Sequence, residues 1–289
     1  MVGRTLAPQG PPSGAVLRQA RTENFTVASL LLPRATREHL LSVYGFARLV
    51  DDIGDEAPGD RLALLTWVEG ELDDISAGRP PRHPLMVTLG RTIRELDLPT
   101  DPFRRLIEAN RKDQTVTRYE TYDELLAYCD LSANPVGHLV LRVFGVDTPT
   151  NHRLSDAVCT GLQLTEHWQD VAEDFARGRV YLPHEDLVRF GCTEDELGAS
   201  TASPALRQLL AFEVERTRDL LHRGSPLVRS VRGRTRVALA GFVGGGHAAL
   251  DAMERVGYDV LAFRPQPTRV GRLRRTIVEL TGVPGRVPQ

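Results

Sequence analysis

Apolar residues recur at helical spacing along most of this 289-residue chain, and this pattern constrains the fold more than any other feature. Between residues 37 and 53 they form a wide apolar stripe that runs from Leu40 to Val50. The same spacing predicts helices over residues 61–75, 84–96, 101–112, 122–144, 154–176, 204–223 and 235–256. Sustained period-two alternation and Asn-Gly hairpin turns are both missing from the sequence. We therefore expect an all-α fold.

Short Pro/Gly breakers separate these stretches, and no long linker divides the chain. This organisation predicts a single domain of about eight to twelve helices, spanning residues 21–265. Residues 1–20 are rich in Pro and Gly and lack the apolar centre of a signal peptide, so we expect a disordered arm there. Residues 266–289 are rich in Arg and Pro. They are interpreted as a solvated tail, with contact to an anionic lipid surface as the alternative.

Composition excludes several classes of function. Lys and Arg number 36 and Asp and Glu 38, so the net charge of −2 argues against a nucleic-acid binder. Lys112 is the only lysine, which nearly excludes a catalytic lysine. The three cysteines have no CxxC spacing, which favours reduced thiols in the cytoplasm over a disulfide framework or zinc knuckle. No window approaches 18 apolar residues, so no membrane-spanning helix is expected.

The predicted helix over 37–53 runs into an acidic cluster that contains Asp51, Asp52, Asp55 and Glu56. Asp51 and Asp55 are four residues apart and so share one helix face, with Arg48 one turn earlier. Like charges at this spacing destabilise a helix, and carboxylates near a helix C-terminus also oppose its dipole. This unfavourable arrangement indicates a purpose other than stability.

A second cluster repeats the pattern. Asp170 and Asp174 are again four apart, and Gln163, Glu166 and His167 lie one and two turns earlier on the same side. The cluster is followed at once by Arg177, Arg179 and Tyr181. Because Mg²⁺ prefers carboxylate oxygens and bridges them to phosphates, two such helices facing each other would form a cup for a magnesium-bound diphosphate. Nearby arginines would bind the phosphate oxygens. The alternative is two solvated acidic helix ends, which is how we interpret the isolated pair Asp73 and Asp74.

These segments resemble the squalene/phytoene synthase family, the head-to-head prenyltransferases. The matching segments lie in family order and spacing between about residues 22 and 265. They are Tyr44–Arg48 leading into Asp51–Glu56, then Arg118-Tyr119, Tyr128-Cys129, Ala133–Gly137, and Gln163 through Asp170–Asp174 to Arg179–Pro183. Segments around Glu23–Phe25, Ser132–Gly137 and His167–Asp170 are similar to the hydroxysqualene synthase branch of bacterial hopanoid biosynthesis, which is often named simply squalene synthase.

The resemblance implies an isoprenoid-synthase helical bundle with a central apolar cavity, and it implies roles for individual residues. By this resemblance Asp51, Asp55, Asp170 and Asp174 hold more than one Mg²⁺, and Arg48 and Arg179 contact the diphosphate. Tyr44, Tyr128, Val136, Gly137 and Gln163 match cavity or catalytic positions, and Phe25 is a further candidate for the cavity wall. His167 is the one histidine beside a motif; it either touches substrate or water, or packs in the core.

Two positions depart from the family pattern. Glu166 stands where the family commonly has asparagine; it adds a candidate metal ligand and a negative charge. Gln169 stands where the family often has an arginine, just before Asp170. One positively charged side chain that could bind phosphate is therefore missing, which favours a substrate with a single diphosphate. We therefore expect magnesium-dependent conversion of presqualene diphosphate to hydroxysqualene. Condensation of two prenyl diphosphates, to presqualene diphosphate, squalene or phytoene, is the alternative, and a non-catalytic scaffold is a third hypothesis.

The expected reaction ends in water capture, so no NADPH is expected, and the chain has no GxGxxG fingerprint after a strand. Gly244–Gly246 lacks the Lys-Ser/Thr of a P-loop and is interpreted as close helix packing or a helix break. The expected partners are an isoprenoid diphosphate and other hopanoid-pathway enzymes. The protein is expected in the cytoplasm, with transient contact at the inner membrane face.

Overall fold

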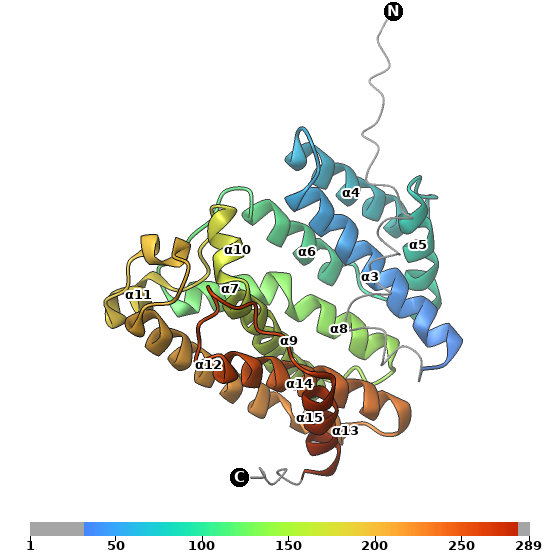
Figure 1. Ribbon diagram of the computed structural model, residues 1–289. Helices are drawn as coiled ribbons and strands as arrows, with labels where there is room; N and C mark the ends of the chain where they lie inside the picture. The colour runs from blue at the N-terminus through green and yellow to red at the C-terminus, as the bar shows by residue number, and fades with distance from the viewer. Residues whose placement is uncertain (1–31, 283–289) are drawn as a thin grey trace, which may run out of the picture. The chain divides into compact units, whose positions relative to one another are not determined.

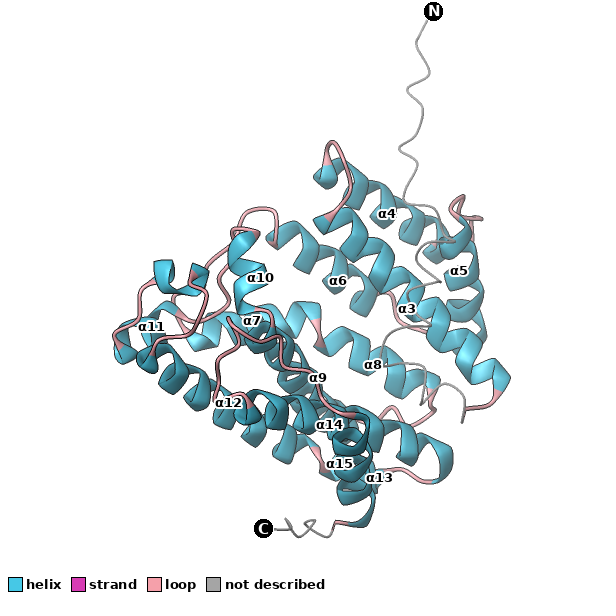
Figure 2. Cartoon of the chain, in the orientation of Figure 1, coloured by secondary structure: helices cyan, strands magenta, loops and turns pink. Residues whose placement is uncertain are grey.

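The structure, a computed structural model, describes residues 32–282, and every regular element in that range is a helix (Figures 1 and 2). The helices are α3 (Arg34–Asp55), α4 (Arg61–Ser76), α5 (Pro84–Leu96), α6 (Asp101–Lys112), α7 (Tyr122–Ser132), α8 (Asn134–Val143), α9 (Pro149–Gln169), α10 (Val171–Ala176), α11 (His184–Phe190), the 3₁₀ turn η1 (Glu194–Gly198), α12 (Pro204–Gly224), α13 (Pro226–Ser230), α14 (Gly233–Arg255) and α15 (Arg269–Thr281). The all-α prediction is confirmed for these residues. The arm at 1–20 and Phe25 lie outside them.

Tertiary contacts divide the chain into two compact units, and each is described by itself. The first contains the chain up to Thr115 together with residues 142–145, and α3 packs there against α4, α5 and α6. The apolar stripe of α3 is the centre of this unit: Leu49, Val50 and Ile53 are fully buried. Phe46 meets Phe103 of α6 edge to face, with ring centroids 5.0 Å apart. Burial of this stripe orients the polar residues of α3 away from the core.

The second unit contains residues 116–141 and those from 146 onward, and α9 is its central helix. Trp168 of α9 is fully buried and its indole N–H donates to the Thr217 hydroxyl of α12 at 2.9 Å. Gly161 of α9 and Gly246 of α14 both lie so close to Leu221 that a methyl group at either would be within 3.0 Å of its side chain. These contacts hold α9, α12 and α14 together in one buried layer.

Residues 244–246 lie inside the uninterrupted helix α14. Of the two interpretations of this glycine run, close helix packing is therefore confirmed and a helix break is wrong. A methyl group at Gly244 would lie 2.6 Å from the backbone nitrogen of Thr276 in α15, so the two helices meet backbone to backbone. Figure 1 shows α14 and α15 side by side at the red end of the chain. Residues 269–281 therefore form a packed helix, so the interpretation of residues 266–289 as a solvated tail is wrong for this part of the chain. The apolar pattern did not indicate the helix, because it contacts α14 through a glycine and through polar side chains.

Two predicted helices are each divided in the structure. The stretch 122–144 is interrupted at Ala133, because Pro135 has no N–H to donate to a carbonyl of the preceding turn. The stretch 154–176 is interrupted at Asp170, which separates α9 from α10. Among residues 32–282 no helix combines the length and the apolar character needed to cross a membrane.

Candidate active site

The first acidic cluster occupies the last turn of α3, in the first unit. Asp51 and Asp55 are exposed, so the carboxylates that share a predicted face are both open to solvent. Arg48 instead pairs with Asp52, with Nε 2.7 Å from Oδ1, and its Nη2 lies 3.9 Å from Glu56. The cluster therefore contains one ion pair, Arg48–Asp52, and two solvent-accessible carboxylates, those of Asp51 and Asp55.

Asn110 of α6, which the sequence analysis did not single out, supports the first of these carboxylates. Its side-chain amide donates to Asp51 Oδ1 at 3.2 Å. This approach requires Gly54, because a methyl group there would overlap the Asn110 amide. Desolvation by the surrounding protein raises the pKa of Asp51 to about 6, the Asn110 hydrogen bond lowers it, and the charge of Asp55 raises it. Asp51 is therefore reachable by solvent although protein surrounds it densely.

The second acidic cluster lies at the junction of α9 and α10, in the second unit. Helical hydrogen bonds continue across the interruption, since Asp170 N–H donates to Glu166 O at 3.0 Å and Asp174 N–H to Asp170 O at 2.8 Å. Glu166, Asp170 and Asp174 therefore follow one another at single-turn intervals, as the spacing predicted. Burial raises the pKa of Asp174 to about 7, and the charge of Asp170 adds to the rise. Burial also raises the pKa of Asp170.

Arg264 is a second residue that the sequence analysis did not place at the site. Its Nη2 lies 3.2 Å from Asp170 Oδ1 and 3.5 Å from Glu173 Oε2. The side-chain amide of Gln169 donates to Pro265 O at 2.6 Å and so fixes the chain next to Arg264. The only sequence signal is the positive charge of Arg264, because pairing across 94 positions of the chain leaves no local pattern.

His167 is buried beside the second cluster. Its ring stacks on Tyr181, with centroids 3.7 Å apart and planes 16° apart, and Tyr128 is tilted against both rings. The Gln163 amide lies 3.2 Å from His167 Nε2 and donates to it, so that nitrogen is unprotonated. Burial, with the nearby charge of Arg179, lowers the pKa of His167 to about 3. His167 is therefore neutral near pH 7.

A small pocket joins several of the predicted site residues within the second unit. His167, Asp174, Arg179 and Tyr181 all line it, together with apolar neighbours such as Val171. The pocket thus places a carboxylate, a guanidinium and a neutral aromatic pair around one space. Such a set can bind an anion at one side and stabilise a developing positive charge against the ring faces.

The remaining predicted residues occupy separate positions. Tyr44 is half-buried on α3 in the first unit, and Val136 is half-buried on α8. Gly137 is buried, and a methyl group there would lie 2.6 Å from Cys159 Sγ, so Gly137 allows α8 to approach α9 closely. Because the two acidic clusters belong to different units, the geometry of each is described on its own.

The donor set of both clusters suits a hard cation. Within residues 32–282 no group of three or more His, Cys, Asp or Glu side chains is already arranged around a common metal position. Mg²⁺ does not require one, because it keeps several waters and commonly takes only one or two carboxylates plus substrate phosphates. The raised pKa values of Asp51 and Asp174 indicate carboxylates whose charge is poorly compensated, and a cation would relieve this.

Residues 32–282 are all-helical and have the fold of the isoprenoid synthases. The sequence model of the family described as Squalene/phytoene synthase matches residues 18–274. The chain belongs to the squalene/phytoene synthase family. Members of this family are enzymes that process prenyl diphosphates head to head, which places the chain in isoprenoid biosynthesis.

Similar proteins fall into more than one branch of the family. The chain is 39% identical over 227 residues to a hydroxysqualene synthase of Rhodopseudomonas palustris, covering 76% of each chain. It is 30% identical over 262 residues to a 15-cis-phytoene synthase of Synechococcus elongatus, covering 86% of this chain and 84% of that one. The crystal structure of squalene synthase HpnC from Alicyclobacillus acidocaldarius superimposes with a TM-score of 0.79 at 44% identity, covering 86% of this chain and 95% of that one.

Proposed function

We propose that this protein converts presqualene diphosphate and water to hydroxysqualene and diphosphate in a magnesium-dependent reaction of hopanoid biosynthesis. The observation that carries the proposal is the pocket in which Asp174 and Arg179 adjoin the neutral His167–Tyr181 stack. The 39% identity to a hydroxysqualene synthase supports the same reaction. In this reaction the carbon–oxygen bond breaks with its electron pair leaving on diphosphate, the carbocation rearranges, and water supplies the new hydroxyl group and releases a proton.

The residues have distinct roles in this proposal. Asp51, Asp55, Glu166, Asp170 and Asp174 would hold Mg²⁺, which when bound supplies positive charge to the leaving diphosphate. Arg179 and Arg48 bind diphosphate oxygens, for which Arg48 would exchange its present pairing with Asp52.

The aromatic residues act on the hydrocarbon side of the site. The ring faces of Tyr128 and Tyr181 stabilise the carbocation. His167 adds no competing positive charge, because Gln163 keeps its Nε2 as an acceptor. Tyr44, Phe25, Val136 and Gly137 are assigned to the cavity that encloses the chain of the substrate, and NADPH has no part in the reaction.

The second candidate is condensation of two prenyl diphosphates, which the 30% identity to a phytoene synthase favours. Product analysis separates the two. The purified enzyme is supplied with Mg²⁺ and either farnesyl diphosphate or presqualene diphosphate, each with and without NADPH. Hydroxysqualene from presqualene diphosphate alone supports our proposal. Efficient use of farnesyl diphosphate alone, or squalene that forms only with NADPH, contradicts it.

Matched variants test the metal assignment in the same assay. Asp51→Asn and Asp170→Asn should each abolish turnover and leave the helical circular-dichroism signal intact. Asp73→Asn is the control, because Asp73 is a carboxylate of α4 that pairs with Arg104 on the surface. Near-normal turnover in both site variants would contradict the assignment.

We also propose that the enzyme works in the cytoplasm and touches the inner membrane face transiently, because its product is a membrane-soluble hydrocarbon alcohol. This contact would allow the substrate and product to be exchanged with other enzymes of the hopanoid pathway through the bilayer.

A further inference from the structure

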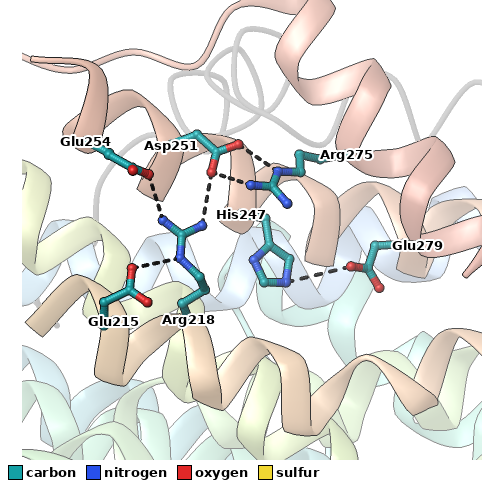
Figure 3. Close-up of polar contacts among 7 residues, drawn as sticks. All are labelled: Glu215, Arg218, His247, Asp251, Glu254, Arg275 and Glu279. Atoms are coloured by element: carbon teal, nitrogen blue, oxygen red, sulfur yellow. Dashed lines mark hydrogen bonds and ion pairs between the residues drawn. The ribbon is translucent and has the colours of Figure 1, made fainter. Parts of the chain in front are cut away.

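Helix α15 turns the polar side chains of Arg275 and Glu279 toward the protein. Arg275 binds Asp251 of α14, with Nε 2.6 Å from Oδ2, and Glu279 Oε1 lies 3.7 Å from Nε2 of the buried His247 (Figure 3). Glu279 is only 10% exposed. Because Gly244 admits the backbone of α15 at Thr276, the two helices are held together by close backbone contact and by the Arg275–Asp251 ion pair. No residue of α15 is buried, so the helix adds no apolar side chain to the core.

The opposite face of α15 is apolar and faces outward. Val270, Leu273 and Ile277 are 77%, 62% and 48% exposed, and their spacing of three and four residues puts them on one side of the helix. Eight large apolar side chains are exposed among residues 32–282, and three of them are these. A surface helix of a globular protein normally has the reverse arrangement, with the apolar stripe toward the core. We define the outward surface of Val270, Leu273 and Ile277, with Arg269 and Arg274, as the α15 face.

The charge of the α15 face is positive. Arg269 and Arg274 are exposed on or beside the apolar stripe, and Glu279, the one acidic residue of α15, is turned inward. A second copy of the chain is a poor occupant, because symmetric pairing of two such faces would bring their arginines together. Anionic lipid complements both properties, since each arginine near the surface gains attraction to headgroups and the apolar side chains enter the headgroup boundary.

We infer that the α15 face is a docking surface for the anionic lipid headgroups of a membrane. This inference names the surface for the membrane contact proposed above. The test of this inference measures binding to lipid vesicles and requires no turnover. A failure of the inference can therefore be distinguished from a failure of the proposed reaction. The helix lies in the plane of the interface, and the ion pair of Arg275 with Asp251 keeps it fixed to the second unit while it does so.

The test is flotation of the full-length protein, without substrate, with vesicles of phosphatidylcholine alone and with vesicles that contain about one third phosphatidylglycerol. The wild type should float with the anionic vesicles and be released as salt rises from about 0.05 to about 0.5 M. The variant Arg269→Gln/Arg274→Gln should lower the partition coefficient by roughly tenfold or more. Leu273→Ser/Ile277→Ser should lower binding to a similar extent, because it removes two of the inserting side chains.

Matched controls separate the α15 face from general surface properties. Arg94→Gln/Arg153→Gln removes two exposed arginines elsewhere, and Val188→Ser removes an apolar side chain that is 64% exposed on α11. Both controls should float like the wild type, and all variants should keep the wild-type helical signal and turnover. Absence of wild-type flotation, equal loss in the controls, or wild-type binding by both α15 variants would overturn the inference. A dimer in sedimentation analysis that only the α15 variants dissociate would overturn it in favour of a second copy.

Discussion

Arg264 Nη2 lies 3.2 Å from Asp170 Oδ1, so a residue beyond the end of α14 compensates a carboxylate at the α9–α10 junction. The same guanidinium reaches Glu173 at 3.5 Å. Its charge lowers the pKa of Asp170, against the larger effect of burial that raises it. Arg264 thereby keeps the second acidic cluster partly neutralised when no cation is bound.

Arg264→Ala should therefore raise the pKa of Asp170 and shift the acidic limb of the activity profile toward higher pH. At pH 6 the variant should need more Mg²⁺ for half-maximal turnover than the wild type, because protons compete better for the carboxylate. Arg153→Ala, at an exposed site on α9, is the control. An unchanged pH profile together with an unchanged Mg²⁺ requirement would show that the pairing has no influence on the site.

His167 should stay neutral over the whole pH range in which the enzyme is folded. Its folded-state pKa of about 3 lies below the value of about 6.5 for an unfolded histidine. The stability that follows from this difference is present above pH 6.5 and is lost as the pH falls toward 3. His167→Asn should remove that contribution to acid unfolding, whereas the exposed His184→Asn should not.

The measurement is the fraction folded, followed by circular dichroism, as the pH is lowered from 7 to 3. The transition of the His167→Asn protein should be less steep than that of the wild type. Turnover should also fall, because the stack on Tyr181 and the acceptor for Gln163 are both altered. Identical acid transitions in the wild type and in both variants would count against a buried, neutral His167.

The sequence was most informative where local rules decide the structure. The helical spacing of apolar residues predicts the ranges 84–96 and 101–112 with their observed limits, and in the structure a proline lies in the first turn of each helix. The positions of Asp51 and Asp55 at the end of α3 follow from the same periodicity, whereas the break of the predicted helix at Asp170 does not. These predictions needed no knowledge of tertiary contacts.

Contacts between distant segments were not predictable in this way. Asn110 reaches Asp51 only because Gly54 leaves space, and Arg264 reaches Asp170 only through the path of the chain after α14. Helix α15 was missed because its apolar residues face outward and its arginines make the segment resemble a tail. Each of these features depends on a partner that is remote in sequence, so no local pattern indicates it.

The ionised carboxylate of Asp174 should lower the stability of the fold although the proposed reaction requires it. Its folded-state pKa of about 7 lies above that of an unfolded aspartate, about 4, so the folded state holds an extra proton between these values. The wild type should therefore lose stability as the pH rises through this window. Asp174→Asn cannot ionise. It should have a Tm at pH 8 about 2–4 °C above the wild type, as for a gain of about 1 kcal/mol, while turnover is lost.

Thermal unfolding at pH 5 and pH 8, with Mg²⁺ or with EDTA, checks this prediction. Mg²⁺ should raise the Tm of the wild type more at pH 8 than at pH 5, because the carboxylates that bind it are ionised only at the higher pH. The Asp174→Asn protein should respond less to Mg²⁺, and Asp73→Asn should behave like the wild type. A lower Tm for Asp174→Asn at pH 8 would contradict the assignment of a desolvated carboxylate.

The absence of a side chain at Gly54 allows Asn110 to donate its hydrogen bond to Asp51. Gly54→Ala places a methyl group into the Asn110 amide and should displace it from Asp51. Without that hydrogen bond the pKa of Asp51 should rise above its present value, so turnover at pH 7 should fall and recover in part at higher pH. Gly70→Ala is the matched control, because Gly70 lies inside α4 with open space around it. That substitution should stabilise the protein by about 0.5–1 kcal/mol and leave turnover unchanged. If the pH profile of Gly54→Ala matched that of the control, the Asn110 hydrogen bond would not set the ionisation of Asp51.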